Sequence, residues 1–163
     1  MASVCIGVIS DTHGLLRPEA LEALRGSEYI VHAGDVGAAE ILRRLAEIAP
    51  VTAVRGNVDR EPWARKLTEV EVLEVGGVLI YVLHDLKQLD LRPEAAGFAA
   101  VVSGHTHAPH IESRRGVLYL NPGSAGPRRF KLPVSVGKLI VEHGSVRGEI
   151  VEILSHGAKA RIS

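Results

Sequence analysis

The sequence predicts an α/β fold in which two mixed β-sheets face each other and helices cover their outer faces. In the first third of the 163-residue chain, apolar strand segments alternate with helical segments, and the second half consists mainly of hairpins. Strands separated by helices pair in parallel through crossovers, whereas hairpin strands pair antiparallel. Two sheets with outer helices is the economical packing for both patterns, although one large mixed sheet stays open. We expect residues 1–163 to form a single domain.

Local signals set the elements of the first third. Pro18 suits a first helical turn, and Gly26 follows the end of that helix. Ile41 and Leu45 repeat with a helical period, and Pro50 stops the second helix. The predicted elements are strands at 4–9, 29–32 and 51–54 and helices at 18–25 and 38–49.

Turn residues divide the second half into hairpins. Gly76-Gly77, Gly116 and His143-Gly144 each lie between two strand-like segments. The predicted elements are strands at 68–75, 78–83, 99–102, 110–114, 117–120, 134–141 and 146–154, with a short helix at 93–97.

Metal-ligating residue types follow the ends of five apolar strands. The carboxyl ends of parallel strands line one edge of a sheet, and ligands bind there. Residues two apart in an extended loop point the same way, so we expect Asp11 and His13 to hold one ion together. The five segments are Asp11-Thr12-His13, Gly34-Asp35, Gly56-Asn57, His84 and Gly104-His105-Thr106-His107.

The chemistry of these groups points to transition metals. Four imidazoles beside carboxylates and an amide oxygen suit Mn, Fe, Zn, Co or Ni rather than Mg alone. Seven candidate ligands are too many for one four-coordinate site with an open position. They fit two ions about 3.5–4 Å apart that share a carboxylate, as in enzymes that displace groups at phosphorus.

These motifs, in this order, resemble the calcineurin-like metallophosphoesterase superfamily. The short chain and the Asn121-Pro122-Gly123-Ser124 segment resemble its small YfcE-type prokaryotic phosphodiesterases. The resemblance implies a four-layer α-β-β-α sandwich and two divalent ions per chain, with manganese the first expectation and Ni, Co, Fe or Zn open. The ligand sets that it implies are Asp11, His13 and His107 for the first ion, Asn57, His84 and His105 for the second, and Asp35 as the bridge.

The resemblance implies a phosphodiesterase, and the charge of such a centre predicts its mechanism. Two divalent ions and two carboxylates leave a net charge of about +2, which attracts phosphate, and a hydroxide shared by the ions would attack phosphorus. Through the metals, Asp11, Asp35, Asn57, His84 and His105 are the predicted catalytic residues. The predicted substrate contacts are Asn57, Asn121, Ser124, Arg128 and Arg129.

Two departures from the family pattern bear on substrate choice. Val58 stands where nuclease and protein-phosphatase branches carry a histidine after the asparagine, which argues against strong nuclease or monoesterase activity. Asp85-Leu86 replaces the Gly-His that usually follows His84 in this branch. Asp85 then either supports a ligand or only reshapes the rim.

Partners and alternatives follow from the bulk properties. A formal net charge of zero gives no electrostatic track for long nucleic acid, so we expect a small phosphodiester as substrate. The single cysteine, the absence of a signal-peptide pattern and the lack of a spanning apolar run predict a cytoplasmic protein without a membrane partner. A homo-oligomer is left open. The alternatives are a non-catalytic assembly scaffold, as in the retromer subunit of related fold, and a phosphomonoesterase or nuclease of the same superfamily.

Overall fold

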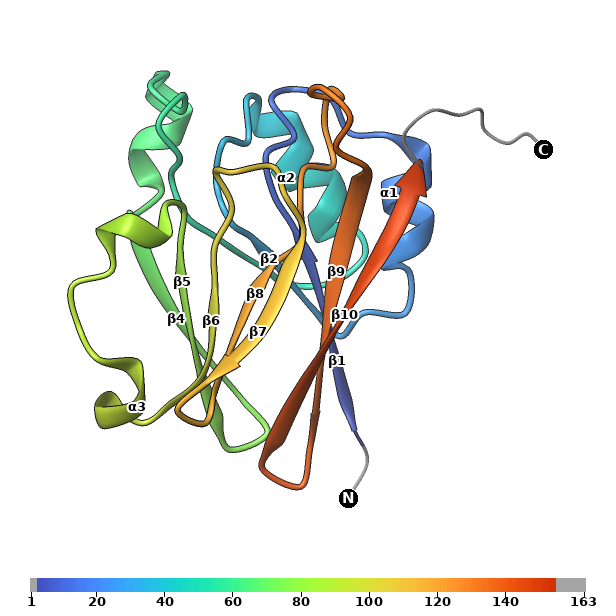
Figure 1. The fold of residues 1–163 in the computed structure, drawn as a ribbon. Helices are drawn as coiled ribbons and strands as arrows, with labels where there is room; N and C mark the ends of the chain where they lie inside the picture. The colour runs from blue at the N-terminus through green and yellow to red at the C-terminus, as the bar shows by residue number, and fades with distance from the viewer. Residues whose placement is uncertain (1–2, 155–163) are drawn as a thin grey trace.

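Two five-stranded mixed sheets form the framework of the molecule (Figure 1), and the computed structural model describes residues 3–154 of the chain. In the first sheet, β1, β2 and β3 are parallel, as the alternating strand–helix pattern predicts, and β9 and β10 extend the sheet antiparallel. Its strand order is β10-β9-β1-β2-β3, with β1 at Val4–Ile9, β2 at Tyr29–His32, β3 at Val51–Ala53, β9 at Val134–Glu142 and β10 at Ser145–Leu154.

The second sheet mixes both pairing modes. Its hairpins are antiparallel as predicted, but β5, β6 and β8 run parallel to one another because the chain crosses over between them. Its strand order is β4-β5-β6-β8-β7, with β4 at Val70–Val75, β5 at Val78–Leu83, β6 at Phe98–Val102, β7 at His110–Arg114 and β8 at Val117–Asn121.

Each of the three hairpins turns on two residues that both have positive φ. These pairs are Gly76-Gly77, Arg115-Gly116 and His143-Gly144. A two-residue loop with positive φ at both positions matches the right-handed twist of the flanking strands. The predicted turn positions are therefore confirmed.

The main core lies between the two sheets. Ile6, Val8 and Leu139 of the first sheet pack against Ile80 and Val102 of the second, and all five side chains are fully buried. Burial on both faces explains why these strands read as nearly continuous apolar runs. One large mixed sheet is thereby excluded for the described residues.

Helices cover the outer faces unequally (Figure 1). Helices α1 (Pro18–Leu24) and α2 (Ala39–Ala46) bury Leu24 and Leu45 against the outer face of the first sheet. Among the described residues, the outer face of the second sheet is covered by the 3₁₀ turn η2 (Leu86–Gln88) and the one-turn helix α3 (Pro93–Ala96) alone. The fourth layer of the predicted sandwich is thus thin.

The boundaries differ from the predictions by a few residues. Helix α2 ends at Ala46 rather than residue 49, because residues 47–49 close as tight turns before Pro50. The 3₁₀ turns η1 (Pro62–Lys66) and η2 were not predicted, since turns this short carry no hydrophobic period. No described helix has the length and apolarity needed to cross a membrane.

Candidate metal centre

The loops after β1 and β2 are joined by a ladder of backbone hydrogen bonds. The N–H groups of Asp11 and His13 donate to the carbonyls of Gly34 and Asp35 over 3.0 and 2.9 Å. These bonds continue the parallel pairing of the two strands beyond their ends. Asp11, His13 and Asp35 therefore lie at the same edge of the sheet, as predicted.

Five of the predicted ligands have a left-handed backbone. The φ angles are 57° at Asp11, 47° at His13, 57° at Asp35, 74° at His105 and 67° at His107. The prediction that Asp11 and His13 share an extended loop is wrong, because the chain turns at both residues. Their side chains nevertheless converge. Such conformations cost of order 1 kcal/mol each for non-glycine residues and cluster at functional sites.

Two glycines allow other loops to approach the carboxylates. A Cβ atom on Gly56 would lie 2.2 Å from Asp35 Oδ1, and one on Gly104 would lie 2.7 Å from Asp11 Oδ2 and 2.0 Å from Ser10 Oγ. Only glycine leaves room for this contact. The loops carrying Asn57 and His105 thus reach the two carboxylates through their glycines.

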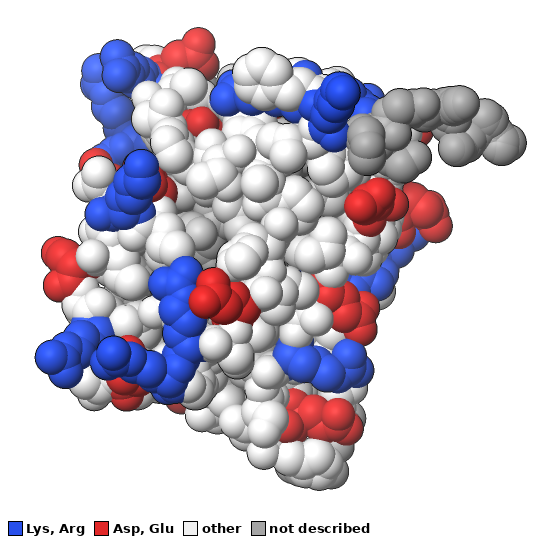
Figure 2. All heavy atoms as spheres, in the orientation of Figure 1, with Lys and Arg blue, Asp and Glu red and all other residues white. Residues whose placement is uncertain are grey.

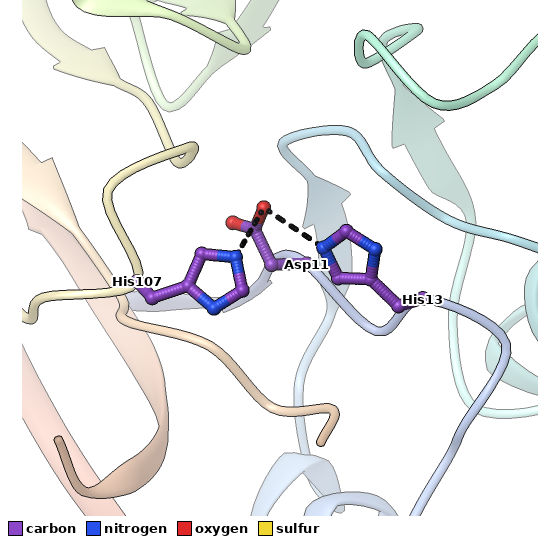
Figure 3. A group of neighbouring side chains, drawn as sticks. All are labelled: Asp11, His13 and His107. Atoms are coloured by element: carbon purple, nitrogen blue, oxygen red, sulfur yellow. Dashed lines mark ion pairs between the residues drawn. The ribbon is translucent and has the colours of Figure 1, made fainter. Parts of the chain in front are cut away.

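The first ligand group consists of Asp11, His13 and His107 (Figure 3). Oδ1 of Asp11 lies 3.4 Å from His107 Nε2 and 3.7 Å from His13 Nε2. The structure brings together the residues predicted for the first ion.

The second ligand group consists of Asp11, Asp35 and His84. Oδ2 of Asp35 lies 3.2 Å from His84 Nε2 and 3.5 Å from His13 Nε2, so it stands between the two groups. Asp11 Oδ1 also reaches toward both groups, at 3.9 Å from His84 Nε2. The geometry therefore offers two shared carboxylates where the sequence predicted Asp35 alone.

Asn57 and His105 are the exposed members of the ligand set predicted for the second ion, and their contact with an ion stays a prediction. Asn57 is exposed, and the His105 side chain is 42% exposed with its Nδ1 3.3 Å from His84 Nε2. Both line one cavity together with His84. On the other side of the His105 ring, Nε2 lies 3.8 Å from Asp85 Oδ2. Asp85 therefore faces a predicted ligand, although it also stands at the rim.

The carboxylates at the centre are held ionised. Burial would raise the pKa of Asp35, but His84 and the Val58 backbone N–H lower it to about 2. Burial would likewise raise the pKa of Asp11, but its interactions with His13 and Ser10 hold it below its ordinary value. The site presents fixed negative charge to a cation.

The imidazoles respond in opposite directions. Asp11 raises the pKa of His13. Burial would lower the pKa of His84, but Asp35 raises it above its usual value. Burial lowers the pKa of His107, and the positive charge of Arg129 acts in the same direction. Because a metal ligand must be deprotonated, protons compete with cations at His13 and His84.

The buried atoms of the site fit metal ions. Within residues 3–154, Asp11 Oδ1 and His13 Nε2 are buried in the site without a hydrogen-bond partner. Buried polar atoms in proteins are nearly always bonded or coordinated. The Nδ1–H of His84 donates to the Ala33 carbonyl over 2.7 Å, which leaves Nε2 as the ligand atom. Donor chemistry and orientation both suit a divalent transition metal.

His32 joins two loops of the site through hydrogen bonds. Its ring is fully buried, and burial lowers its pKa to about 4. Nδ1 accepts from the Gly34 N–H over 3.1 Å, and Nε2–H donates to the Thr12 hydroxyl, which donates to the Val36 carbonyl. The neutral ring thus joins the two loops that carry Asp11 and Asp35.

The predicted substrate contacts divide into two classes. Asn121 is buried and bonds the Gly104 carbonyl, the Thr106 hydroxyl and the Gly123 N–H. Ser124 is buried and donates to the Asp11 carbonyl. These two side chains support the loops. Arg128 and Arg129 are exposed, and the Arg129 charge acts on His13 and His107, so their contact with substrate stays a prediction.

Asp59 is a supporting residue that sequence reasoning missed. It is 3% exposed, and its carboxylate accepts from the N–H groups of Val36, Gly37 and Gly56 at 3.1, 3.0 and 2.9 Å. It therefore clamps the loop after β2 to the loop after β3. A lone aspartate in a polar loop gave no signal, because two of its three partners, Val36 and Gly37, lie 23 and 22 residues away.

Comparison with known proteins identifies the family. Residues 4–144 match the calcineurin-like phosphoesterase superfamily domain. The chain belongs to this superfamily. It is 39% identical to proteins named probable metallophosphoesterase from Methanocaldococcus jannaschii and Methanothermobacter thermautotrophicus. The alignments cover 86% and 90% of this chain and 77% and 91% of the relatives.

Solved structures of the superfamily confirm the fold. A novel archaeal phosphodiesterase superposes with a TM-score of 0.76 at 23% identity, over 91% of this chain and all of that chain. YfcE, a phosphoesterase from Escherichia coli, gives 0.65 at 24%, over 92% of this chain and all of that chain. Vps29 of Entamoeba histolytica complexed with Zn²⁺ gives 0.71 at 24%, over 92% of this chain and 99% of that chain. The predicted resemblance is thereby confirmed, and the chain is a metallophosphoesterase with candidate metal ligands at one edge of its sheets.

Proposed function

We propose that this metallophosphoesterase is a dinuclear metal-dependent phosphodiesterase acting on a small phosphodiester. The observation that carries the proposal is the position of Asp35 Oδ2, 3.5 Å from His13 Nε2 and 3.2 Å from His84 Nε2. One carboxylate oxygen between imidazoles of two ligand groups suits a pair of ions about 3.5–4 Å apart. Manganese is the first expectation, with Ni, Co, Fe and Zn as the other candidates.

The residues of the chain have separate roles in holding the ions and attracting the phosphate. Asp11, His13 and His107 would hold one ion and His84 the other, with Asp35 shared by both and Asn57 and His105 at the open side of the second. When bound, the ions would supply Lewis acidity, lower the pKa of water and neutralise charge on the phosphate oxygens. Arg129 adds positive charge near His13 and His107, where the phosphate would be attracted.

Val58 supports the choice of a diester with a good leaving group. Its side chain is 46% exposed beside Asn57, at the position where other branches carry a histidine. Valine cannot give a proton to a departing alkoxide. The leaving group must therefore carry its own stabilisation or draw a proton from water.

The surface charge supports a small substrate. Basic and acidic side chains are interspersed on the face shown in Figure 2, and the basic ones form no continuous stripe there. Long nucleic acids bind through many phosphate contacts to lysine and arginine. A short or small phosphodiester fits this surface better.

Elemental analysis of tag-free protein beside hydrolysis assays tests the proposal. We expect about two ions per chain, and turnover of bis(p-nitrophenyl) phosphate well above that of p-nitrophenyl phosphate with Mn²⁺ or Ni²⁺. Asp35→Ala removes the shared oxygen and is expected to lower metal content and abolish turnover. Glu47→Ala, an exposed carboxylate at the end of α2, is the matched control. Wild-type turnover in Asp35→Ala would overturn the proposal.

A non-catalytic scaffold is the second candidate. The likeness in fold to Vps29, a protein named for vacuolar sorting rather than for catalysis, favours it. It predicts protein without tightly bound metal, without turnover under any of the ions, and in a fixed assembly with another protein. The competent ligand type at each predicted position favours the enzyme.

A further inference from the structure

We propose that the substrate is an unsymmetrical phosphodiester with one polar arm and one apolar arm, each held in its own cavity beside the metal centre. This inference rests on the proposed function and specifies its substrate class. Two cavities, of about 410 and 520 Å³, share Asp85 and His105 as lining residues. Each falls within the range of roughly 300–1,000 Å³ that is typical of small-molecule sites.

The first cavity has mixed walls, in which polar side chains stand beside Val70, Tyr81 and Leu83. It extends from Asn57 and His84 along the edge of the second sheet to Arg55, Gln88 and Asp90. Within residues 3–154, the side chains of Asn57, Gln88 and Asp90 form no hydrogen bond to another protein group. Their amide and carboxylate groups offer both donors and acceptors to a ligand.

Arg55 gives this cavity a fixed cationic wall. Its guanidinium donates to the Leu67 carbonyl over 2.9 Å and to Glu69 over 3.3 Å. These contacts hold the side chain at the cavity and leave it paired rather than free for a second phosphate. Groups of mixed donor and acceptor character, such as a sugar or a nucleoside, match these walls better than an anion does.

The second cavity has mainly apolar walls. Leu86, Ala108 and Pro109 line it beside the Tyr119 ring, which is 8% exposed. Arg114 lies over the Tyr119 ring at 4.5 Å and fixes that wall. An alkyl or aryl group would bury apolar surface here without leaving a buried polar group unpaired.

Asp85 and His105 form a wall shared by the two cavities, so a phosphate held at the metal centre beside His105 would have one cavity on each side. His105 reaches the centre through its contact of 3.3 Å with His84, and Asp85 lies 3.8 Å behind it. A phosphodiester has two ester oxygens that point away from each other, so its arms diverge from the phosphorus. One arm entering each cavity would orient the diester, whereas a monoester has no second arm to bury.

A series of three diesters tests this on the wild-type enzyme. All carry the p-nitrophenyl group, which is apolar, and the second arm is methyl, p-nitrophenyl or thymidine linked through its 5′ oxygen. We expect kcat/KM for the thymidine diester to exceed that for bis(p-nitrophenyl) phosphate by about tenfold, with the methyl diester lowest. Values within twofold of one another, or a slower thymidine diester, would overturn the inference.

Two variants assign the arms to their cavities. Gln88→Leu removes an amide from the polar cavity and is expected to erase the thymidine advantage. Ala108→Trp fills the apolar cavity and is expected to raise KM for the nitrophenyl diesters about tenfold. Ala46→Trp, the same change at an exposed position of α2, is the matched control and should leave all three values unchanged. A thymidine advantage that persists in Gln88→Leu, or KM values that stay unchanged in Ala108→Trp, would count against the assignment.

Binding of unreactive phosphonate diesters separates this inference from the proposed function. Calorimetry with thymidine and methyl phosphonates needs no turnover. If no diester is hydrolysed with any metal, the proposed function fails, and these binding constants decide the inference. Thymidine phosphonate that binds no tighter than the methyl compound would then overturn it, and tighter binding that Gln88→Leu abolishes would support it.

Discussion

Replacing Asp59 with alanine tests whether this carboxylate holds the metal-centre loops together. The change leaves the N–H groups of Val36, Gly37 and Gly56 without their acceptor. Each buried donor left unsatisfied costs about 1–3 kcal/mol, and the partly buried Gly37 N–H can reach water. Two buried donors at about 1.5 kcal/mol each predict a loss of about 3 kcal/mol, or roughly 10 °C in melting temperature.

Urea unfolding of wild type, Asp59→Ala and Asp90→Ala measures this loss. Asp90 is an exposed carboxylate that accepts no hydrogen bond from the described residues, so its removal should change the free energy of unfolding by less than about 0.5 kcal/mol. Metal affinity should also fall in Asp59→Ala, because the loops carrying Asp35 and Asn57 lose their common anchor. A loss of stability below about 1 kcal/mol would refute the clamp.

Two further predictions concern His32 and Gly104. The pKa of His32 is lowered from an ordinary value near 6.5 to about 4, so the unfolded chain binds a proton between these pH values that the folded protein does not. The free energy of unfolding should therefore be unaffected by His32 above pH 6.5 and should fall by about 3 kcal/mol as the pH is lowered through 4. Ring resonances of His32 that titrate near pH 6.5 in the folded protein would contradict this. Gly104→Ala places a Cβ 2.0 Å from Ser10 Oγ and 2.7 Å from Asp11 Oδ2, and should cost about 1–3 kcal/mol and weaken metal binding. Removing the hydroxyl as well, in Gly104→Ala/Ser10→Ala, should recover part of the stability, and a double variant no more stable than Gly104→Ala would argue against the clash.

The fold was predictable because its signals are local. Apolar runs of four to six residues, the glycine-containing turns of the hairpins and Pro18 or Pro50 beside helices each depend on a few neighbouring positions. The parallel pairing of β5, β6 and β8 was not predictable in the same way. Parallel pairing depends on the side of the sheet at which the chain re-enters after α3 and after residues 103–109, and the hydrophobic period of a strand does not encode that position.

The candidate site was predictable in composition but not in geometry. Carboxylates and imidazoles at strand ends identified the ligand types of Asp11, His13, Asp35, His84 and His107. The left-handed turns that aim several of these side chains depend on hydrogen bonds between loops distant in sequence. The supporting roles of Asp59, Asn121 and Ser124 also depend on such bonds, so no local pattern announced them.

Hydrogen bonds between loops explain how the metal centre keeps its ligands in a strained backbone conformation. Five ligands in left-handed conformations, and the two carboxylates of Asp11 and Asp35 held in one ligand group, destabilise the loops that carry them. The N–H groups of Asp11 and His13 are fixed by hydrogen bonds to the loop after β2. Asp59 and His32 also hold that loop through hydrogen bonds to the Val36 and Gly34 N–H groups. Cations bound by Asp11 and Asp35 would add attraction at the point where the strain is concentrated. Metal binding should therefore stabilise this protein more than it would stabilise a protein with the same ligands at an exposed site. The bound ions would offset the repulsion between the Asp11 and Asp35 carboxylates, which the fold holds close together.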